Sequence, residues 1–237
     1  MSDKKEITPP TQEEILSFLY PRNIKCPVCE REFTDFGVRT TKLRVEKMDN
    51  DFRKRYYVVD PNHYGVTLCY HCGYTAIHAY FERITEKQQD LIKKFITPLY
   101  KPQEYHVPLS QADVLNRYDQ ALACCQAIYA KDSQFAFTYL KKAWVYRDME
   151  NMKDREIKEM REAYIRFKDA FTSESFPLGE MDEITAKYLI AELARRLGNF
   201  AEALRWVGDV VVAKGIPSAI KERAVILKEL AREGNMN

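Results

Sequence analysis

The most informative residues of the chain are two Cys-x-x-Cys pairs, Cys26 with Cys29 and Cys69 with Cys72. A gap of two residues lets both sulfurs of one tight turn face the same point. Four thiolates in two such turns can complete a tetrahedral zinc shell, with Zn–S distances of about 2.3 Å. The sequence therefore predicts one structural Zn2+ ion, held by Cys26, Cys29, Cys69 and Cys72.

The residues around the two pairs suit tight metal-binding turns. Gly73 follows the second pair, where such a turn favours a positive φ, and Pro27 stiffens the turn of the first pair. Glu30 stands at the position that matches Gly73, a departure that removes no ligand. The long span between the pairs, residues 30–68, suits a zinc ribbon whose two turns lie on separate hairpins with a sheet inserted between them.

Other roles for these cysteines fit the pattern less well. A redox dithiol needs only one Cys-x-x-Cys, normally at a helix N-terminus after a strand. Two disulfides need an oxidising compartment, and nothing in the sequence indicates export. A sensor that releases zinc on oxidation is a third reading, which requires accessible thiolates. Of the four histidines, none is expected to be a ligand, and His78 is expected to contact a sulfur or a backbone carbonyl near the metal.

The composition predicts a soluble, helix-rich protein of the cytoplasm. Charged residues make up 30% and apolar residues 46% of the 237 positions, with only 8 glycines. The 37 basic and 35 acidic residues nearly cancel, so net charge alone favours no particular partner. The polar segment from Met1 to Glu6 argues against a signal peptide, and no run is apolar enough for a membrane span. No membrane partner is expected.

The pattern along the chain predicts an α+β, mainly α, protein in three segments. Residues 1–20 read as a frayed tail and a short helix from Gln12 to Leu19 with a cap at Thr11. Residues 21–108 are expected to form a zinc-ribbon-like module with a following helix and connector. Residues 109–237 are expected to form an all-α domain.

Within the module, the runs of β-branched and aromatic residues predict short strands, and a helical pattern follows the second cysteine pair. This helix is expected to break near Thr85, which has Gln88 at the spacing of a capping box. Prolines at 98, 102 and 108 then place an irregular connector before the helical domain. The strands are predicted at 38–45, 56–59 and 64–68, and the helix at 76–96.

From Ser110 onward, apolar residues recur at gaps of three and four, which predicts six helices joined by short turns. Residues 188–204 resemble a tetratricopeptide repeat (TPR), with alanines where its two helices cross, Gly198 in the turn and Phe200 after it. Lys187 and Ala194 depart from that pattern, since aromatics are usual there. The domain 109–237 is therefore expected to be TPR-like, a stack of antiparallel helical hairpins.

In combination, these motifs resemble a bacterial family of unknown function with an N-terminal four-cysteine zinc ribbon and C-terminal TPR-like helices. The resemblance covers roughly residues 20–235 and implies a cytoplasmic bacterial protein with bound zinc. It implies no activity. The matching stretches are Cys26–Cys29, Thr41–Arg44, Tyr64–Val66, Cys69–Ala76 and Tyr139–Arg147.

The segment 39–57 supports an alternative function, nucleic-acid binding. Basic residues that alternate with aromatics beside a zinc ribbon can follow a phosphate backbone and stack on bases. Acidic residues are interspersed, so a solvated strand face with tyrosines packed on the zinc module is the competing interpretation. The basic residues are Arg39, Lys42, Arg44, Lys47, Arg53, Lys54 and Arg55, against Glu46, Asp49 and Asp51. The tyrosines are Tyr56, Tyr57, Tyr64, Tyr70 and Tyr74.

No motif supports catalysis, because the chain has no glycine-rich phosphate loop, no Gly-x-Ser-x-Gly and no His-Glu-x-x-His. A thiol-redox role is the one residual enzymatic possibility, although the adjacent Cys124 and Cys125 are expected to pack in a helical core. The favoured function is protein recognition through the concave face of the TPR-like helices. Exposed residues such as Arg147, Lys187 and Arg195 are the expected contact positions.

Overall fold

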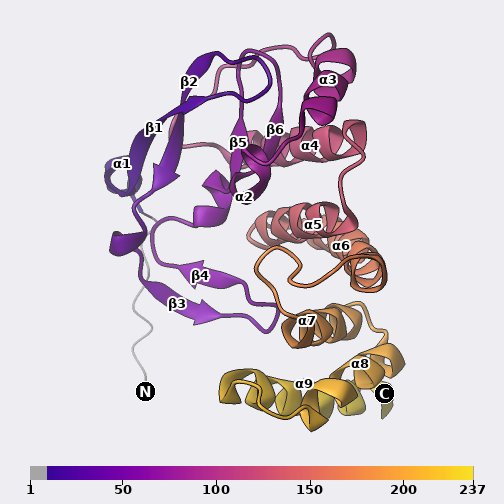
Figure 1. The fold of residues 1–237 in the computed structure, drawn as a ribbon. Helices are drawn as coiled ribbons and strands as arrows, with labels where there is room; N and C mark the ends of the chain where they lie inside the picture. Colours follow the sequence, from indigo (N-terminus) through magenta and orange to yellow (C-terminus); the bar gives the residue numbers. More distant parts are fainter. Residues whose placement is uncertain (1–9, 237) are drawn as a thin grey trace.

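The computed structural model describes residues 10–236, in which a strand-rich front part is followed by a stack of helices (Figure 1). This arrangement confirms the α+β, mainly α, fold class. The tail predicted before Thr11 falls almost wholly outside the described residues. The short helix after it is present as α1 (Gln12–Phe18), and the Thr11 side chain accepts a hydrogen bond from the backbone N–H of Glu14.

Three two-stranded antiparallel sheets make up the front part. The first cysteine pair lies in the turn of the first sheet, and the second pair in the turn of the third. The sheets are β1 (Leu19–Lys25) with β2 (Glu32–Val38), β3 (Val45–Met48) with β4 (Lys54–Tyr56), and β5 (Val66–Leu68) with β6 (Thr75–Ile77). The expected two hairpins with an inserted sheet are therefore all present.

The strand boundaries differ from those predicted. The predicted strand 38–45 is wrong, because Val38 ends β2 and a 3-10 turn, η1 (Thr40–Lys42), precedes β3. The strands β1 and β2 were missed. Pro21 lies within β1, which tolerates it because β1 pairs on one edge only. The buried face of β2 includes Asp35 and Gly37, so β2 does not show the alternation of apolar and polar residues that predicts a strand.

Three further predicted elements are shifted. The predicted strand 56–59 shares only Tyr56 with β4, and the strand 64–68 is reduced to β5, because Tyr64 closes the 3-10 helix η2 (Pro61–Tyr64). The predicted helix 76–96 begins with strand β6 and is then split into α2 (His78–Phe81) and α3 (Glu86–Phe95). The break at Thr85 is confirmed, and its capping box with Gln88 is formed.

The helical part contains the six helices expected, all within the described residues. Ser110 and Asp113 form a capping box at the first of them, and Gly198, with φ of 78°, follows the end of the fourth. The α4 helix packs on β5 and β6 as well as on the next helix. The helices are α4 (Gln111–Ala127), α5 (Asp132–Arg147), α6 (Lys153–Ser173), α7 (Glu183–Arg196), α8 (Phe200–Val212) and α9 (Ser218–Met236).

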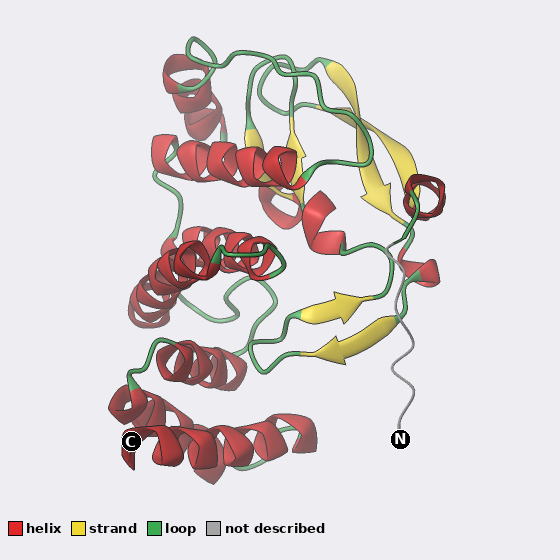
Figure 2. Ribbon diagram, turned by 180° about the vertical axis from the view of Figure 1, so that it is seen from behind, coloured by secondary structure: helices red, strands yellow, loops and turns green. Residues whose placement is uncertain are grey.

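The β3–β4 hairpin reaches across from the front part to the helices (Figure 2). Its tip contacts α5, α7 and α9, and we call the surface of these helices that receives it the inner face. The Tyr188 hydroxyl donates to the carbonyl oxygen of Asn50 at 3.0 Å, and Arg223 donates to that of Asp49 at 3.3 Å. The Phe52 ring packs against Tyr188, with 5.1 Å between centroids. The hairpin tip thus fills the inner face.

An ion pair fixes this tip in place. Asp51 is fully buried, lies 2.5 Å from the Arg147 guanidinium and accepts a hydrogen bond from the indole of Trp144 at 3.1 Å. Burial opposes the ionisation of Asp51, but the Arg147 guanidinium outweighs it and lowers the pKa of this carboxyl. Arg147 also pairs with Asp49 at 3.0 Å and with Glu156 of α6 at 2.6 Å. One guanidinium therefore holds the hairpin against two helices.

We expect Asp51→Ala to lower the free energy of unfolding by about 3 kcal/mol, because it leaves the buried Arg147 short of a partner. Glu46→Ala, an exposed change on the same hairpin, is the control and should cost less than about 0.5 kcal/mol. Urea unfolding followed by circular dichroism measures both. Equal midpoints for the two variants would show that the ion pair does not stabilise this junction.

Candidate metal centre

The two cysteine turns have matching backbone geometry. In the first, the Glu30 N–H donates to the Cys26 carbonyl at 2.9 Å, and in the second the Gly73 N–H donates to the Cys69 carbonyl at 2.9 Å. Glu30 and Gly73 have φ of 60° and 76°, so both occupy the left-handed region. The expectation that Glu30 replaces a glycine without loss of the turn is confirmed.

Glycine is required only in the second turn. A Cβ on Gly73 would lie 2.4 Å from the ring of Tyr100, and its positive φ would add backbone strain. The Gly73 carbonyl also accepts a hydrogen bond from the side chain of Gln120 of α4, at 2.9 Å. The second turn is therefore enclosed by the connector and by α4.

The four sulfurs of the two turns converge. They all lie within 4.8 Å of one another, with 3.7 Å between Cys26 and Cys72 and 3.6 Å between Cys29 and Cys69. A tetrahedral ion with bonds of about 2.3 Å needs sulfur–sulfur edges of about 3.8 Å. The cysteines are therefore positioned to bind one metal ion, as the sequence predicted.

The site is enclosed by apolar side chains. Cys26 and Cys69 have no exposed surface, Cys72 is 3% exposed, and only Cys29 is half-buried. The hydrophobic cluster around them continues into α4, through Cys124 and Ile128. The metal site and the first helix of the helical part therefore share one core. Other members of the cluster are Ile24, Val28, Phe33, Tyr74, Phe81 and Ile92.

The pKa of three of these thiols depends strongly on the neighbouring thiols. Hydrogen bonds with Cys26 and Cys72 lower the pKa of Cys69 to about 2, while the bond with Cys69 raises the pKa of Cys26 to about 12. The pKa of Cys72 is raised by the same neighbours and by burial. One thiolate is thus stabilised by the thiols that donate to it. A divalent cation supplies the charge that four thiolates need, and its binding releases protons.

Four thiolates form a closed coordination shell. Such a site has no open position for water or substrate, in contrast to catalytic zinc sites with three protein ligands. Its chemistry is therefore to cross-link two hairpins. The sulfurs join the β1–β2 and β5–β6 hairpins, whose cysteines lie 40 and 46 residues apart in the chain.

His78 does not contact a sulfur, which corrects that part of the expectation. Its Nε2 lies 3.1 Å from the guanidinium of Arg22, and its Nδ1 meets the hydroxyl of Thr67. Burial, and then the charge of Arg22, lower the pKa of His78 to about 4, although Asp35 opposes this effect. His78 therefore supports the junction of β1 and β5 as a neutral imidazole.

The vicinal cysteines pack in the core, as expected. Cys124 is 1% and Cys125 6% exposed, and burial raises the pKa of each thiol to about 12. Cys124 accepts a hydrogen bond from the Thr75 N–H at 3.3 Å and lies 3.5 Å from the Gly73 carbonyl. Such thiols are poor nucleophiles. Cys124 connects α4 to the second metal-binding turn.

A second cluster was missed by the sequence analysis. Asp60, His63 and Asp148 bring their ligand atoms within 4.8 Å of one another, across 88 residues of chain that no local motif spans. The guanidinium of Arg53 lies among them, 3.5 Å from Asp60 and hydrogen-bonded to Asp148. Because Arg53 already pairs with both carboxylates, and Arg55 also lies 4.0 Å from Asp148, this cluster is an ion-pair network rather than a metal site.

The structure divides the basic segment 39–57 in two. Arg53 is buried among acidic partners, and Arg55 binds the Asp49 carboxylate at 3.1 Å, so neither belongs to an open basic surface. Tyr64 and Tyr74 are buried as well. The remaining basic residues are exposed, namely Arg39, Lys42, Arg44, Lys47 and Lys54.

The family described as "uncharacterized protein conserved in bacteria" (DUF2225) has a sequence model that matches residues 19–235. The chain belongs to this family. The match covers the metal-binding turns, the inserted hairpin and all six helices of the helical part, so the resemblance noted in the sequence is confirmed. No curated protein and no solved structure matches the chain. No helix within residues 10–236 is long and apolar enough to cross a membrane.

His78 makes the stability of this family member dependent on pH. Its pKa of about 4 in the folded state lies below the usual 6.5, so the unfolded chain binds more protons between these values. Stability is therefore complete above about pH 6.5 and is lost as the pH falls towards 4. Between pH 7 and pH 4.5, the free energy of unfolding should fall by about 2 kcal/mol less in His78→Gln than in the native protein, because glutamine does not titrate.

Urea unfolding at the two pH values measures this difference. His71→Gln is the matched control, because His71 is exposed and forms one hydrogen bond, to the Glu32 carbonyl. Acid also protonates metal ligands, but it does so in all three proteins. Identical pH dependence of the native protein and His78→Gln would show that His78 does not cause the loss of stability in acid.

Proposed function

We propose that this protein is a non-catalytic module that zinc organises and that binds another protein through its helical part, in the cytoplasm. Zinc is supported by the donor set, since four soft thiolates in a tetrahedral arrangement suit Zn2+ far better than Mg2+ or Ca2+. The closed shell supports a structural role. The burial of three of the four sulfurs argues against an oxidation sensor.

We expect the purified protein to contain about one zinc per chain. Cys26→Ser should lose the metal and much of the tertiary structure of the front part, because structural zinc contributes directly to folding. Cys124→Ser is the matched control, since it changes a buried cysteine outside the cluster and should retain zinc. Elemental analysis and near-ultraviolet circular dichroism measure both effects. Equal zinc content in the two variants would exclude the proposed ligand set.

The inner face of the helices is an unsuitable partner surface, because the chain's own hairpin tip fills it. Arg147, which was expected to be exposed, is buried beneath that tip, and this expectation is wrong. Lys187 and Arg195 are half-buried and pair with acidic residues of their own part of the chain, Lys187 with Glu183 and Arg195 with Glu192. The partner surface must therefore lie elsewhere on the helices.

The observation that carries the proposal is the outer surface of α9. The last element of a repeat array normally presents a polar face to solvent, because nothing packs on it. In α9, Val225 is 42% and Ile226 52% exposed, and Leu230 adjoins them at 36%. Val225 and Ile226 line a hollow of about 480 Å³, whose rim holds Lys221 and Glu222. An apolar centre with a charged rim is typical of a protein-binding surface.

We expect Val225→Asp/Ile226→Asp to reduce the amount of partner that co-purifies with the tagged full-length protein by at least about 10-fold. A charge in the centre of an apolar contact is costly to desolvate, whereas the same charge is harmless in water. Quantitative mass spectrometry of the purified complexes from a native host measures the partner. Zinc content and circular dichroism verify that the variant is folded.

The control is Ile165→Asp, which changes an exposed isoleucine of α6 that is 43% accessible. It should leave the partner in place. Loss of the partner from both variants, or from neither, would contradict a binding surface on α9. Absence of any reproducible partner of the native protein would contradict protein recognition as a whole.

A further inference from the structure

We propose that the groove between α1 and the base of the β3–β4 hairpin binds single-stranded nucleic acid. This groove is distinct from the α9 surface, and the inference does not depend on protein recognition there. Its volume is about 1060 Å³, and it is lined by Phe18, Lys42, Arg44, Tyr56 and Tyr57, among others. That volume is at the upper limit of small-ligand pockets, so the groove suits a segment of a polymer.

The charge that faces solvent near this groove is more positive than the sequence indicates. The segment 39–55 has seven basic and three acidic residues, a net of +4 that looks heavily interspersed. Asp49 and Asp51 turn inward, where they pair with Arg55 and Arg147. The exposed charged residues of this segment are therefore five basic side chains against Glu46 alone, and Glu14 of α1 is the acidic residue among those that line the groove.

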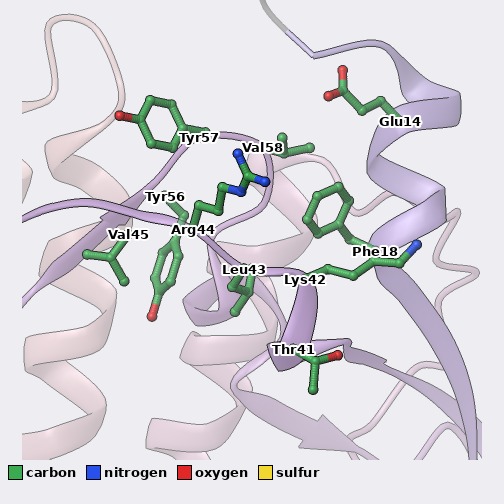
Figure 3. A pocket seen from close by; sticks show the side chains of 10 residues that line it. All are labelled: Glu14, Phe18, Thr41, Lys42, Leu43, Arg44, Val45, Tyr56, Tyr57 and Val58. Atoms are coloured by element: carbon green, nitrogen blue, oxygen red, sulfur yellow. The ribbon is translucent and has the colours of Figure 1, made fainter.

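Arg44 is the central cation of the groove. It is exposed, and among the described residues no hydrogen-bond or ion-pair partner is found for its guanidinium. Figure 3 draws this guanidinium between the side chains of Tyr57 and Phe18, with Glu14 on the opposite wall. Lys42 donates to the carbonyl oxygen of Ser17 at 3.0 Å, which holds its ammonium group at the α1 side of the groove. Two cations are thus available for phosphates.

The aromatic residues decide between kinds of anionic ligand. Tyr57 is 53% exposed, and Tyr56, the last residue of β4, is half-buried beside it. The exposed Tyr57 ring near the unpaired Arg44 suits a base that stacks while phosphates bind Arg44 and Lys42. An acidic peptide would use the cations but leave the Tyr57 ring in water. The observations therefore favour nucleic acid, in single-stranded form because stacking requires unpaired bases.

The test uses the full-length, zinc-loaded protein and fluorescently labelled oligothymidylate and oligouridylate of about 12 nucleotides. Anisotropy titrations between about 50 mM and 300 mM salt give the affinity and its salt dependence. Lys42→Ala/Arg44→Ala should weaken binding by at least about 10-fold and reduce the slope of log K against log salt by about 1.4, for two phosphates at about 0.7 each. Tyr57→Ala should weaken binding by about 5-fold or more with an unchanged slope.

The matched control is Arg155→Ala/Lys158→Ala, which removes two exposed basic charges from α6. It should change neither the affinity nor the slope. Absence of binding by the native protein at low salt overturns the proposal. An equal loss in the control variant overturns it as well, because binding would then reflect net charge. Equally tight binding of polyglutamate would overturn it too, by assigning the groove to acidic polypeptides.

Discussion

The structure depends on the convergence of four sulfurs that cannot all be charged without a cation between them. Neighbouring thiols and burial raise the pKa of Cys26 and Cys72, whereas hydrogen bonds with these two thiols lower the pKa of Cys69, so without a cation the negative charge is favoured on Cys69. A divalent ion bound there would convert this crowding into a cross-link of two hairpins that are small and marginally stable alone. Because the surrounding cluster includes Cys124 of α4, the same cross-link would also position the first helix of the stack.

The inserted hairpin connects the front part to the distant helices. Its base lies beside α1, across the groove that Phe18 and Tyr56 line, and its tip is held by Arg147, Tyr188 and Arg223 from α5, α7 and α9. Asp51 has no exposed surface, so releasing the tip would strand a charge on each side. The hairpin is therefore a permanent brace across the inner face.

The sequence predicted the features that depend on neighbours in the chain. The Cys-x-x-Cys spacing, the cap at Ser110 and the turn at Gly198 each rest on residues at most five positions apart, and all are confirmed. Features that depend on distant pairing were missed. Asp35 is buried in β2 because Arg117, 82 residues later, lies 2.6 Å away, and a buried aspartate conceals the alternation of a strand. Arg53 was assigned to the surface for the same reason, since Asp148 is 95 residues away.

The same long-range pairing explains how the segment 39–55 both attaches the hairpin tip to the helices and exposes basic side chains to solvent. From Asp49 to Arg55 the odd-numbered residues point away from solvent and form ion pairs, with one another or with other parts of the chain. Lys54, which lies between them, is exposed. Asp49, Asp51 and Arg53 lie between β3 and β4, in the tip that packs on the helices, so contacts with the helices turn these charges inward. The charges that point inward are of both signs and offset one another in ion pairs. The exposed charges that remain are mostly basic. A segment with interspersed acidic residues and a net charge of +4 can thus expose five basic side chains against one acidic side chain, and only the fold reveals which charges remain available to a ligand.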